Sequence, residues 1–171
     1  NGLAEVFKQH PAIYILSDEI YEHINYIGKH ESIAQFDFLK ERVILINGLS
    51  KAFAMTGWRL GYFAANTEIV KACDKIQGHF TSAACSIIQR ASIAALTCYL
   101  QPTQLMIEEF RKRRARVMEL VKDIPGFICN EPPGAFYIFP DVSYYFGKKT
   151  SKGETIANAD DLCMYLLNEA H

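Results

Sequence analysis

The sequence carries almost no net charge, because 18 lysines and arginines are balanced by 19 aspartates and glutamates. No overall field therefore draws the molecule toward nucleic acid or an anionic membrane. The chain also lacks an apolar run long enough to cross a membrane, and residues 1–10 lack the basic and hydrophobic blocks of an export signal. These absences favour small uncharged or amphoteric partners, with no nucleic acid and no membrane among them.

Cysteine pairs with metal-site or redox spacing are also missing. The five cysteines form no Cys-x-x-Cys pair and lie in apolar helical or strand-like stretches: Cys73, Cys85, Cys98, Cys129 and Cys163. A scattered, odd set predicts reduced, buried thiols in a cytoplasmic protein rather than a disulfide framework. The five histidines show no metal-ligand spacing with one another or with the cysteines, so no metal site is predicted.

Half of the residues are hydrophobic, and their pattern predicts strands that alternate with helices. Short apolar runs at residues 12–16, 43–46 and 60–64 predict three core strands. Helical periodicity covers residues 69–80 and 84–95, with Thr81 or Ser82 as the expected cap of the second helix. Pro102 favours the start of a long helix that ends at Lys122.

The last part of the chain has a different pattern. Pro125-Gly126 ends the long helix, and short strands are predicted at residues 127–129 and 135–139, followed by a helix at 160–170. We therefore predict an α/β fold with three parts. Residues 1–100 would belong to a large parallel-sheet domain, residues 101–122 would form a connecting helix, and residues 123–171 would form an incomplete, smaller α+β domain.

The stretch from Asn47 to Tyr62 places Lys51 at the end of a predicted buried strand. A lysine in a partly desolvated pocket loses its proton more readily and can form a Schiff base with a carbonyl. Arg59 and Ser50 could bind a phosphate nearby, because a guanidinium and a hydroxyl both donate hydrogen bonds to it. The alternative is a solvated Lys51 with Arg59 paired to a carboxylate, and the residues alone favour neither.

A second group of polar residues follows the first predicted strand. Asp18 comes directly after the buried run, and Tyr21 lies three residues later. A carboxylate at a buried strand end is expected to meet a cation or several donors, and a protonated pyridine nitrogen would serve. The alternative, which this segment alone favours, is that Asp18 caps a helix beginning near Glu19.

Three motifs together resemble the class I/II aminotransferases, which are pyridoxal-phosphate enzymes of fold type I. The motifs are SDEIYE at residues 17–22, SKAFAMTGWRLGY at 50–62 and PPGAFYIFPD at 132–141. The first two are long, ordered and correctly spaced, and the resemblance covers nearly the whole chain. The sequence is especially similar to the aspartate aminotransferase branch found in many bacteria and archaea.

This resemblance implies a role for each of five residues. Lys51 would form a Schiff base with pyridoxal 5′-phosphate and later move a proton between the substrate Cα and the cofactor. Asp18 would pair with the ring nitrogen, which keeps that nitrogen protonated and strengthens the ring as an electron sink. Tyr21 would hydrogen-bond the phenolic oxygen, while Ser50 and Arg59 would bind the phosphate.

The sequence departs from the family in what it lacks. Many relatives have serine where this chain has Gly48, so one possible phosphate donor is lost. Four features of the family have no counterpart here: the Asn-Pro-x-Asn-Pro-Thr-Gly-like segment, the early phosphate-binding loop, the ring-stacking aromatic residue and the arginine for the substrate α-carboxylate. The chain opens without methionine and closes straight after a helical pattern. We therefore expect a fragment of a longer enzyme, inactive by itself.

The family implies transfer of an amino group from an L-amino acid, with L-aspartate preferred, to 2-oxoglutarate, in a full-length homodimer. Other chemistry on the same scaffold is an alternative: a β-lyase, a cyclopropane-forming synthase, or an aminotransferase for aromatic or alanine substrates. Two further alternatives are a pyridoxal-binding regulator fused to a DNA-binding domain and a non-enzymatic remnant. The basic run at residues 111–116 is interpreted as a solvated helix face rather than a nucleic-acid site.

Overall fold

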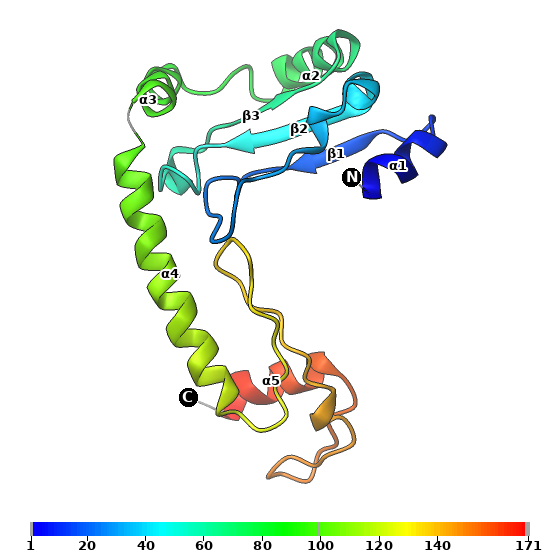
Figure 1. Cartoon of the computed structure of the whole chain (residues 1–171), viewed down its shortest axis with the longest axis vertical. Helices are drawn as coiled ribbons and strands as arrows, with labels where there is room; N and C mark the ends of the chain where they lie inside the picture. Colours follow the sequence, from blue (N-terminus) through cyan, green and yellow to red (C-terminus); the bar gives the residue numbers. More distant parts are fainter. Residues whose placement is uncertain (1, 99, 170–171) are drawn as a thin grey trace. The chain divides into compact units, whose positions relative to one another are not determined.

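The computed structural model describes residues 2–98 and 100–169, and the chain divides into two compact units, Asn1–Glu108 and Glu109–His171 (Figure 1). The boundary between the units falls inside the long helix α4 (Gln101–Lys122). The expected division into a large domain, a connecting helix and a small domain stays a prediction.

The first unit is built on a three-stranded sheet of order β1-β2-β3, formed by Ile15–Asp18, Val43–Gly48 and Gly61–Ala64 (Figure 1). Strand β1 runs parallel to β2, and β3 runs antiparallel to it. The expected α/β class is confirmed, although the sheet is mixed where a parallel one was expected. The segment between β2 and β3 contains only turns and the 3-10 helix η3 (Thr56–Trp58), so the chain doubles back without a crossover helix.

One face of the sheet carries the buried core of this unit. Ala4 of α1 (Gly2–Gln9) and Leu39 of the 3-10 helix η2 (Asp37–Arg42) pack with Ile15 and Val43 from the strands. The Arg42 guanidinium ties the end of α1 to the sheet by donating to three carbonyl oxygens, those of Phe7, His10 and Ile13. A cation at a helix C-terminus also meets the negative end of the helix dipole.

Helices α2 (Thr67–Phe80) and α3 (Ser86–Thr97) follow β3, in agreement with the predicted helical periods. The predicted cap of α3 is wrong, because its N-cap is Cys85 and makes no side-chain hydrogen bond. Thr81 is instead the C-cap of α2, and Ser82 has a φ of 62°, which places it in the turn between the helices. At the start of α2, the Asn66 side chain accepts a hydrogen bond from the Ile69 N–H.

The expectation of buried thiols is also wrong. Cys73, Cys85, Cys98 and Cys163 are exposed free cysteines, and Cys129 is half-buried. Apolar periodicity identified the helices correctly, but it did not establish that these faces are covered. Exposed apolar side chains on the same helices, such as Phe80 and Ile87, show that burial here depends on contacts outside each helix.

The second unit contains α4 from Glu109 onward, the 3-10 helix η4 (Ser143–Tyr145) and α5 (Ala159–Glu169). The strands expected at 127–129 and 135–139 do not form, although an isolated bridge joins Ile128 to Asp141. Two features interrupt an extended ladder: Pro132 and Pro133 have no N–H to donate, and Ala135 adopts a left-handed φ of 56°.

The basic run on α4 is accompanied by acidic neighbours. Lys112 pairs with Glu109 at 2.6 Å, and Arg116 pairs with Glu119 at 2.7 Å.

Among residues 2–98 and 100–169, no helix has the length and apolar character needed to span a membrane.

Candidate functional site

The sheet topology brings the five predicted site residues to one edge. Asp18 is the last residue of β1, and Ser50 and Lys51 follow the end of the parallel strand β2. Arg59 lies just before β3, whose first residue is paired with the last residue of β2. Tyr21 lies in the turn after β1. Polar side chains that gather at the carboxyl ends of neighbouring strands form the usual ligand site of an open α/β sheet.

Lys51 occupies a tight turn rather than the middle of a mobile loop. Its neighbours Leu49 and Ala52 are buried, and the Leu49 carbonyl accepts the N–H groups of Phe53 and Met55 at 3.3 Å. The lysine itself is half-buried, with Nζ 5.6 Å from the centre of the Tyr21 ring. This distance is within the range of a cation–π contact. The fold therefore joins the two sequence motifs directly, through Lys51 and Tyr21.

The alternative role for Asp18 as a helix cap is wrong. Residues 20–23 form a turn, and no helix begins near Glu19. The Asp18 carboxylate accepts a hydrogen bond from the Ile20 N–H at 3.2 Å, and its side chain is exposed at the end of the strand. A carboxylate held in this way remains accessible to a cationic group that approaches the edge of the sheet.

Arg59 stands in a backbone conformation that non-glycine residues rarely adopt, with φ 57° and ψ 50°. Its guanidinium donates to the Thr56 carbonyl at 2.8 Å, which bridges the two ends of η3. The guanidinium is exposed and carries several N–H donors, so this bond leaves capacity for an anion. Left-handed backbone at a sheet edge is a form of strain often found at ligand sites.

Gly48, where the sequence departs from the family, lies in a close contact between two strands. Gly48 pairs with Gly61 across β2 and β3. A Cβ added to Gly48 would lie 3.2 Å from both the Gly61 Cα and the Leu60 carbonyl oxygen, and 3.3 Å from Ile20 Cδ1. A Cβ at this position would therefore require its neighbours to move by a few tenths of an ångström. Gly48 thus lies in a close contact between the strands on either side of the Lys51 turn.

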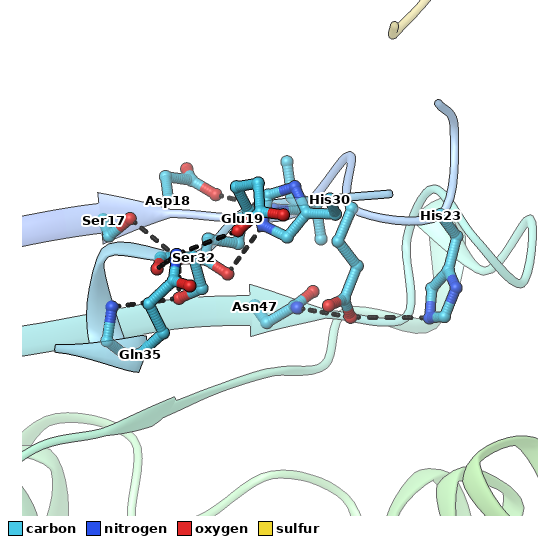
Figure 2. A network of polar contacts seen from close by, with 12 residues as sticks. Ser17, Asp18, Glu19, His23, His30, Ser32, Gln35 and Asn47 are labelled. Atoms are coloured by element: carbon cyan, nitrogen blue, oxygen red, sulfur yellow. Dashed lines mark hydrogen bonds and ion pairs between the residues drawn. The ribbon is translucent and has the colours of Figure 1, made fainter. Parts of the chain in front are cut away.

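A network centred on Glu19, the residue after Asp18, was missed from the sequence (Figure 2). Glu19 is 6% exposed, and its carboxylate accepts hydrogen bonds from the hydroxyls of Ser17 and Ser32 at 3.0 and 2.6 Å. His30 Nε2 lies 2.8 Å from the other oxygen. Burial alone would raise the pKa of Glu19, but the bonds from Ser32, His30 and Ser17 together hold it below its ordinary value.

A second missed contact links the β1 turn to β2. The Asn47 side-chain amide donates to the Glu22 carboxylate at 2.8 Å, and its carbonyl oxygen accepts the Gly48 N–H at 2.7 Å. His23 lies on the same carboxylate, at 3.4 Å (Figure 2). These bonds fix the turn that carries Tyr21 against the strand that leads to Lys51. The sequence signal was only the polar character of residues 17–23 and 47.

Comparison with known proteins identifies the family of this chain. The family model for aminotransferase class I and II matches residues 1–171. The bifunctional aspartate aminotransferase and glutamate/aspartate-prephenate aminotransferase of Petunia hybrida is 44% identical, over 98% of this chain and 36% of that protein. An aspartate aminotransferase from Rhizobium meliloti is 42% identical, over 99% of this chain and 42% of that protein.

Solved structures give the same result. The crystal structure of the Rhizobium meliloti aspartate aminotransferase matches with a TM-score of 0.93 and 41% identity, covering 99% of this chain and 43% of that one. An aromatic aminotransferase from Pyrococcus horikoshii OT3 matches with a TM-score of 0.79 and 38% identity, over 83% of this chain and 38% of that one. The chain spans less than half the length of these relatives. It belongs to the class I and II aminotransferase family.

Proposed function

We propose that the full-length protein is a pyridoxal-phosphate-dependent aminotransferase and that this chain supplies the edge of the sheet that holds the cofactor. The carrying observation is the convergence of Asp18, Tyr21, Ser50, Lys51 and Arg59 at one sheet edge from two distant segments. These side chains match the groups of the cofactor. The amine fits the aldehyde, the carboxylate fits the protonated ring nitrogen, the guanidinium and one hydroxyl fit the phosphate, and the other hydroxyl fits the phenolic oxygen.

Each residue has a distinct role in this proposal. When bound, pyridoxal phosphate supplies an electron sink for the electrons left on the substrate Cα after proton removal. Lys51 attaches the cofactor covalently and afterwards moves the proton to and from the substrate Cα. The Asp18 carboxylate holds a proton on the ring nitrogen, and the Tyr21 hydroxyl hydrogen-bonds the phenolic oxygen. Ser50 and Arg59 bind the phosphate.

We further propose that the protein takes the amino group from L-aspartate and passes it to 2-oxoglutarate. This choice rests on the relatives named as aspartate aminotransferases. An aromatic donor is the second candidate, favoured by the match to the aromatic aminotransferase of Pyrococcus horikoshii OT3. The homodimer and the cytoplasmic location stay predictions.

The test uses the full-length protein incubated with pyridoxal phosphate. Borohydride reduction followed by peptide mass spectrometry should place the cofactor on Lys51. Unreduced protein mixed with L-aspartate should change the cofactor absorption to that of the pyridoxamine form, and 2-oxoglutarate should restore it. L-Phenylalanine serves as the competing donor.

Each outcome decides between the candidates. A label on Lys51 with conversion by L-aspartate supports both parts of the proposal. A label with conversion only by L-phenylalanine keeps the aminotransferase and replaces its donor. Absence of any label on Lys51 contradicts the proposed cofactor chemistry altogether.

A further inference from the structure

The turn that carries Lys51 is anchored from a distant helix by Thr103. We propose that Thr103 is a positioning residue for Lys51, acting through the carbonyl group of Ala52. The Thr103 hydroxyl donates a 2.9 Å hydrogen bond to that carbonyl, across 51 residues of sequence. The inference rests on the proposed function, since it assigns Thr103 to the placement of the cofactor-binding amine.

Both partners of this bond are shielded from water. Thr103 is 6% exposed and lies in the first turn of α4, while Ala52 is 3% exposed and directly follows Lys51. A buried carbonyl that loses its donor cannot recover the bond from bulk solvent, so its loss costs more than a surface hydrogen bond would. The hydroxyl therefore fixes the peptide next to the lysine.

Backbone hydrogen bonds also hold this turn. The three backbone hydrogen bonds within it, Phe53 and Met55 N–H to Leu49 and Ala54 N–H to Lys51, are each 3.3 Å long. Such bonds are longer than the usual distance of about 2.9–3.0 Å for N–H donors. The bond from Thr103 is the shorter link, and it comes from outside the turn.

A cavity of about 540 Å³ lies next to both the turn and Thr103. It is lined mainly by small or apolar side chains, including Ala52, Phe53, Met55, Cys98 and Met106, with Thr103 among them. A pocket beside the turn gives it room to shift if the hydrogen bond were removed. The hydroxyl of Thr103 therefore limits this movement.

The consequence reaches Lys51 through one peptide unit. Nζ of Lys51 lies over the Tyr21 ring, and a shift of Ala52 would move the lysine backbone relative to Tyr21 and Asp18. Displacements of roughly 1 Å in reacting groups can cost about a hundredfold in rate. A side chain that never touches the cofactor thus helps set where the reactive amine lies.

The experiment compares three variants of the full-length protein with wild type. Thr103→Val removes the hydroxyl at nearly constant shape, and Thr103→Ser restores a hydroxyl. Thr97→Val is the matched control, because Thr97 makes a 2.7 Å bond to the Ile93 carbonyl from an exposed site on α3. The measurements are the dissociation constant for pyridoxal phosphate, the pH midpoint of the bound cofactor's absorption change, and the melting temperature.

We expect Thr103→Val to weaken cofactor binding about tenfold, as expected for loss of a buried hydrogen bond. Its absorption midpoint should differ from that of wild type, because the surroundings of the lysine amine change. Thr103→Ser and Thr97→Val should match wild type in both measurements. If Thr103→Val does not yield folded protein, Thr103→Ala is measured in the same way.

Three results would overturn the inference. Thr103→Val could lower the melting temperature while leaving affinity and midpoint unchanged, which would make the bond purely structural. Thr103→Ser could be as impaired as Thr103→Val, so that the hydroxyl would not be the cause. A wild-type protein that binds no cofactor would overturn the proposed function and this inference together, whereas the first two results leave the proposed function intact.

Discussion

The unit Asn1–Glu108 is organised by a sheet, whereas Glu109–His171 consists of helices joined by a long irregular segment. In the first unit, paired strands bring residues from positions 18 to 61 to one edge. In the second, order depends on single contacts, such as the stacked rings of Phe110 and Phe136 at 5.2 Å. Regular strand pairing thus positions chemical groups, while the irregular unit relies on individual side chains for its own stability.

This contrast predicts that changes in the second unit alter stability without altering cofactor chemistry. Gly126 has a φ of +84°, and a Cβ there would lie 2.0 Å from Tyr144 Cδ1. Gly126→Ala should lower the free energy of unfolding by about 3 kcal/mol, from left-handed strain and overpacking together. Gly147→Ala is the control, because Gly147 shares the positive φ but has open space around it.

Chemical denaturation of the full-length protein measures this difference. Gly147→Ala should lose about 1–2 kcal/mol, from backbone strain alone. Both variants should keep the cofactor spectrum of wild type at temperatures well below unfolding. A changed spectrum in Gly126→Ala would contradict the expectation that this position affects stability alone.

In the first unit the converse is expected, with altered chemistry and little change in stability. Asp18→Asn should reduce the rate of amino transfer roughly 10–100-fold, which corresponds to the loss of a hydrogen bond to a charged group. Its unfolding free energy should stay close to wild type, since Asp18 is exposed and its side chain bonds only locally, to the Ile20 N–H. Asp37→Asn, an exposed carboxylate paired with Lys40, is the matched control and should retain the wild-type rate.

A substitution of Glu19 tests whether the polar network around this residue also stabilises the first unit. Glu19→Gln should lower the unfolding free energy by about 1–3 kcal/mol, because a buried acceptor of several hydrogen bonds is altered. Since the pKa of Glu19 is lowered in the folded state, its contribution is present above the ordinary value of 4.5 and disappears as the pH falls through the lowered value. His30 is the titratable side chain bonded to this carboxylate.

The measurement is the urea midpoint of the full-length protein at pH 6 and at successively lower pH. Wild type should lose stability on acidification more steeply than Glu19→Gln. Glu109→Gln is the control, because solvent screens the exposed pair of Glu109 with Lys112. If the urea midpoints of wild type and Glu19→Gln fall in parallel as the pH is lowered, Glu19 does not contribute to the acid sensitivity of the protein.

The smallest effect is expected for two arginines of the basic run on α4. Arg114 donates to the Pro132 carbonyl at 2.8 Å and pairs with Glu131, with its side chain 15% exposed. Arg114→Ala should cost about 1–2 kcal/mol of unfolding free energy. Arg116→Ala should cost less than about 0.5 kcal/mol, because its pair with Glu119 is exposed. Equal losses in thermal melts would contradict this difference in burial.

The fold could be predicted where its pattern is local. Periodicity identified α2, α3 and α4, and apolar runs located the three strands to within a few residues. The same reasoning failed at residues 127–139, where Ala135 turns the backbone left-handed and the prolines remove donors. It failed again for the cysteines, because a helix pattern shows which face is apolar but not whether that face is covered.

The residues of the candidate site also differ in whether the sequence alone could predict them. Asp18, Tyr21, Ser50, Lys51 and Arg59 were named from ordered motifs, because the chemistry requires particular residue types at fixed spacing. Glu19 and Thr103 were not, because their hydrogen-bond partners lie up to 13 and 51 residues away. No local pattern reveals such pairs.

The sequence by itself determined the family, the α/β class and the residue types available for the proposed cofactor, since these depend on the order of short segments in the chain. Tertiary structure alone decided that β3 runs antiparallel, that Gly48 lies in a close contact with Gly61, and that Ala52 is held from α4. Those outcomes depend on distances between segments that are remote in sequence. Such distances are set by packing and hydrogen bonding of the whole unit rather than by any local preference.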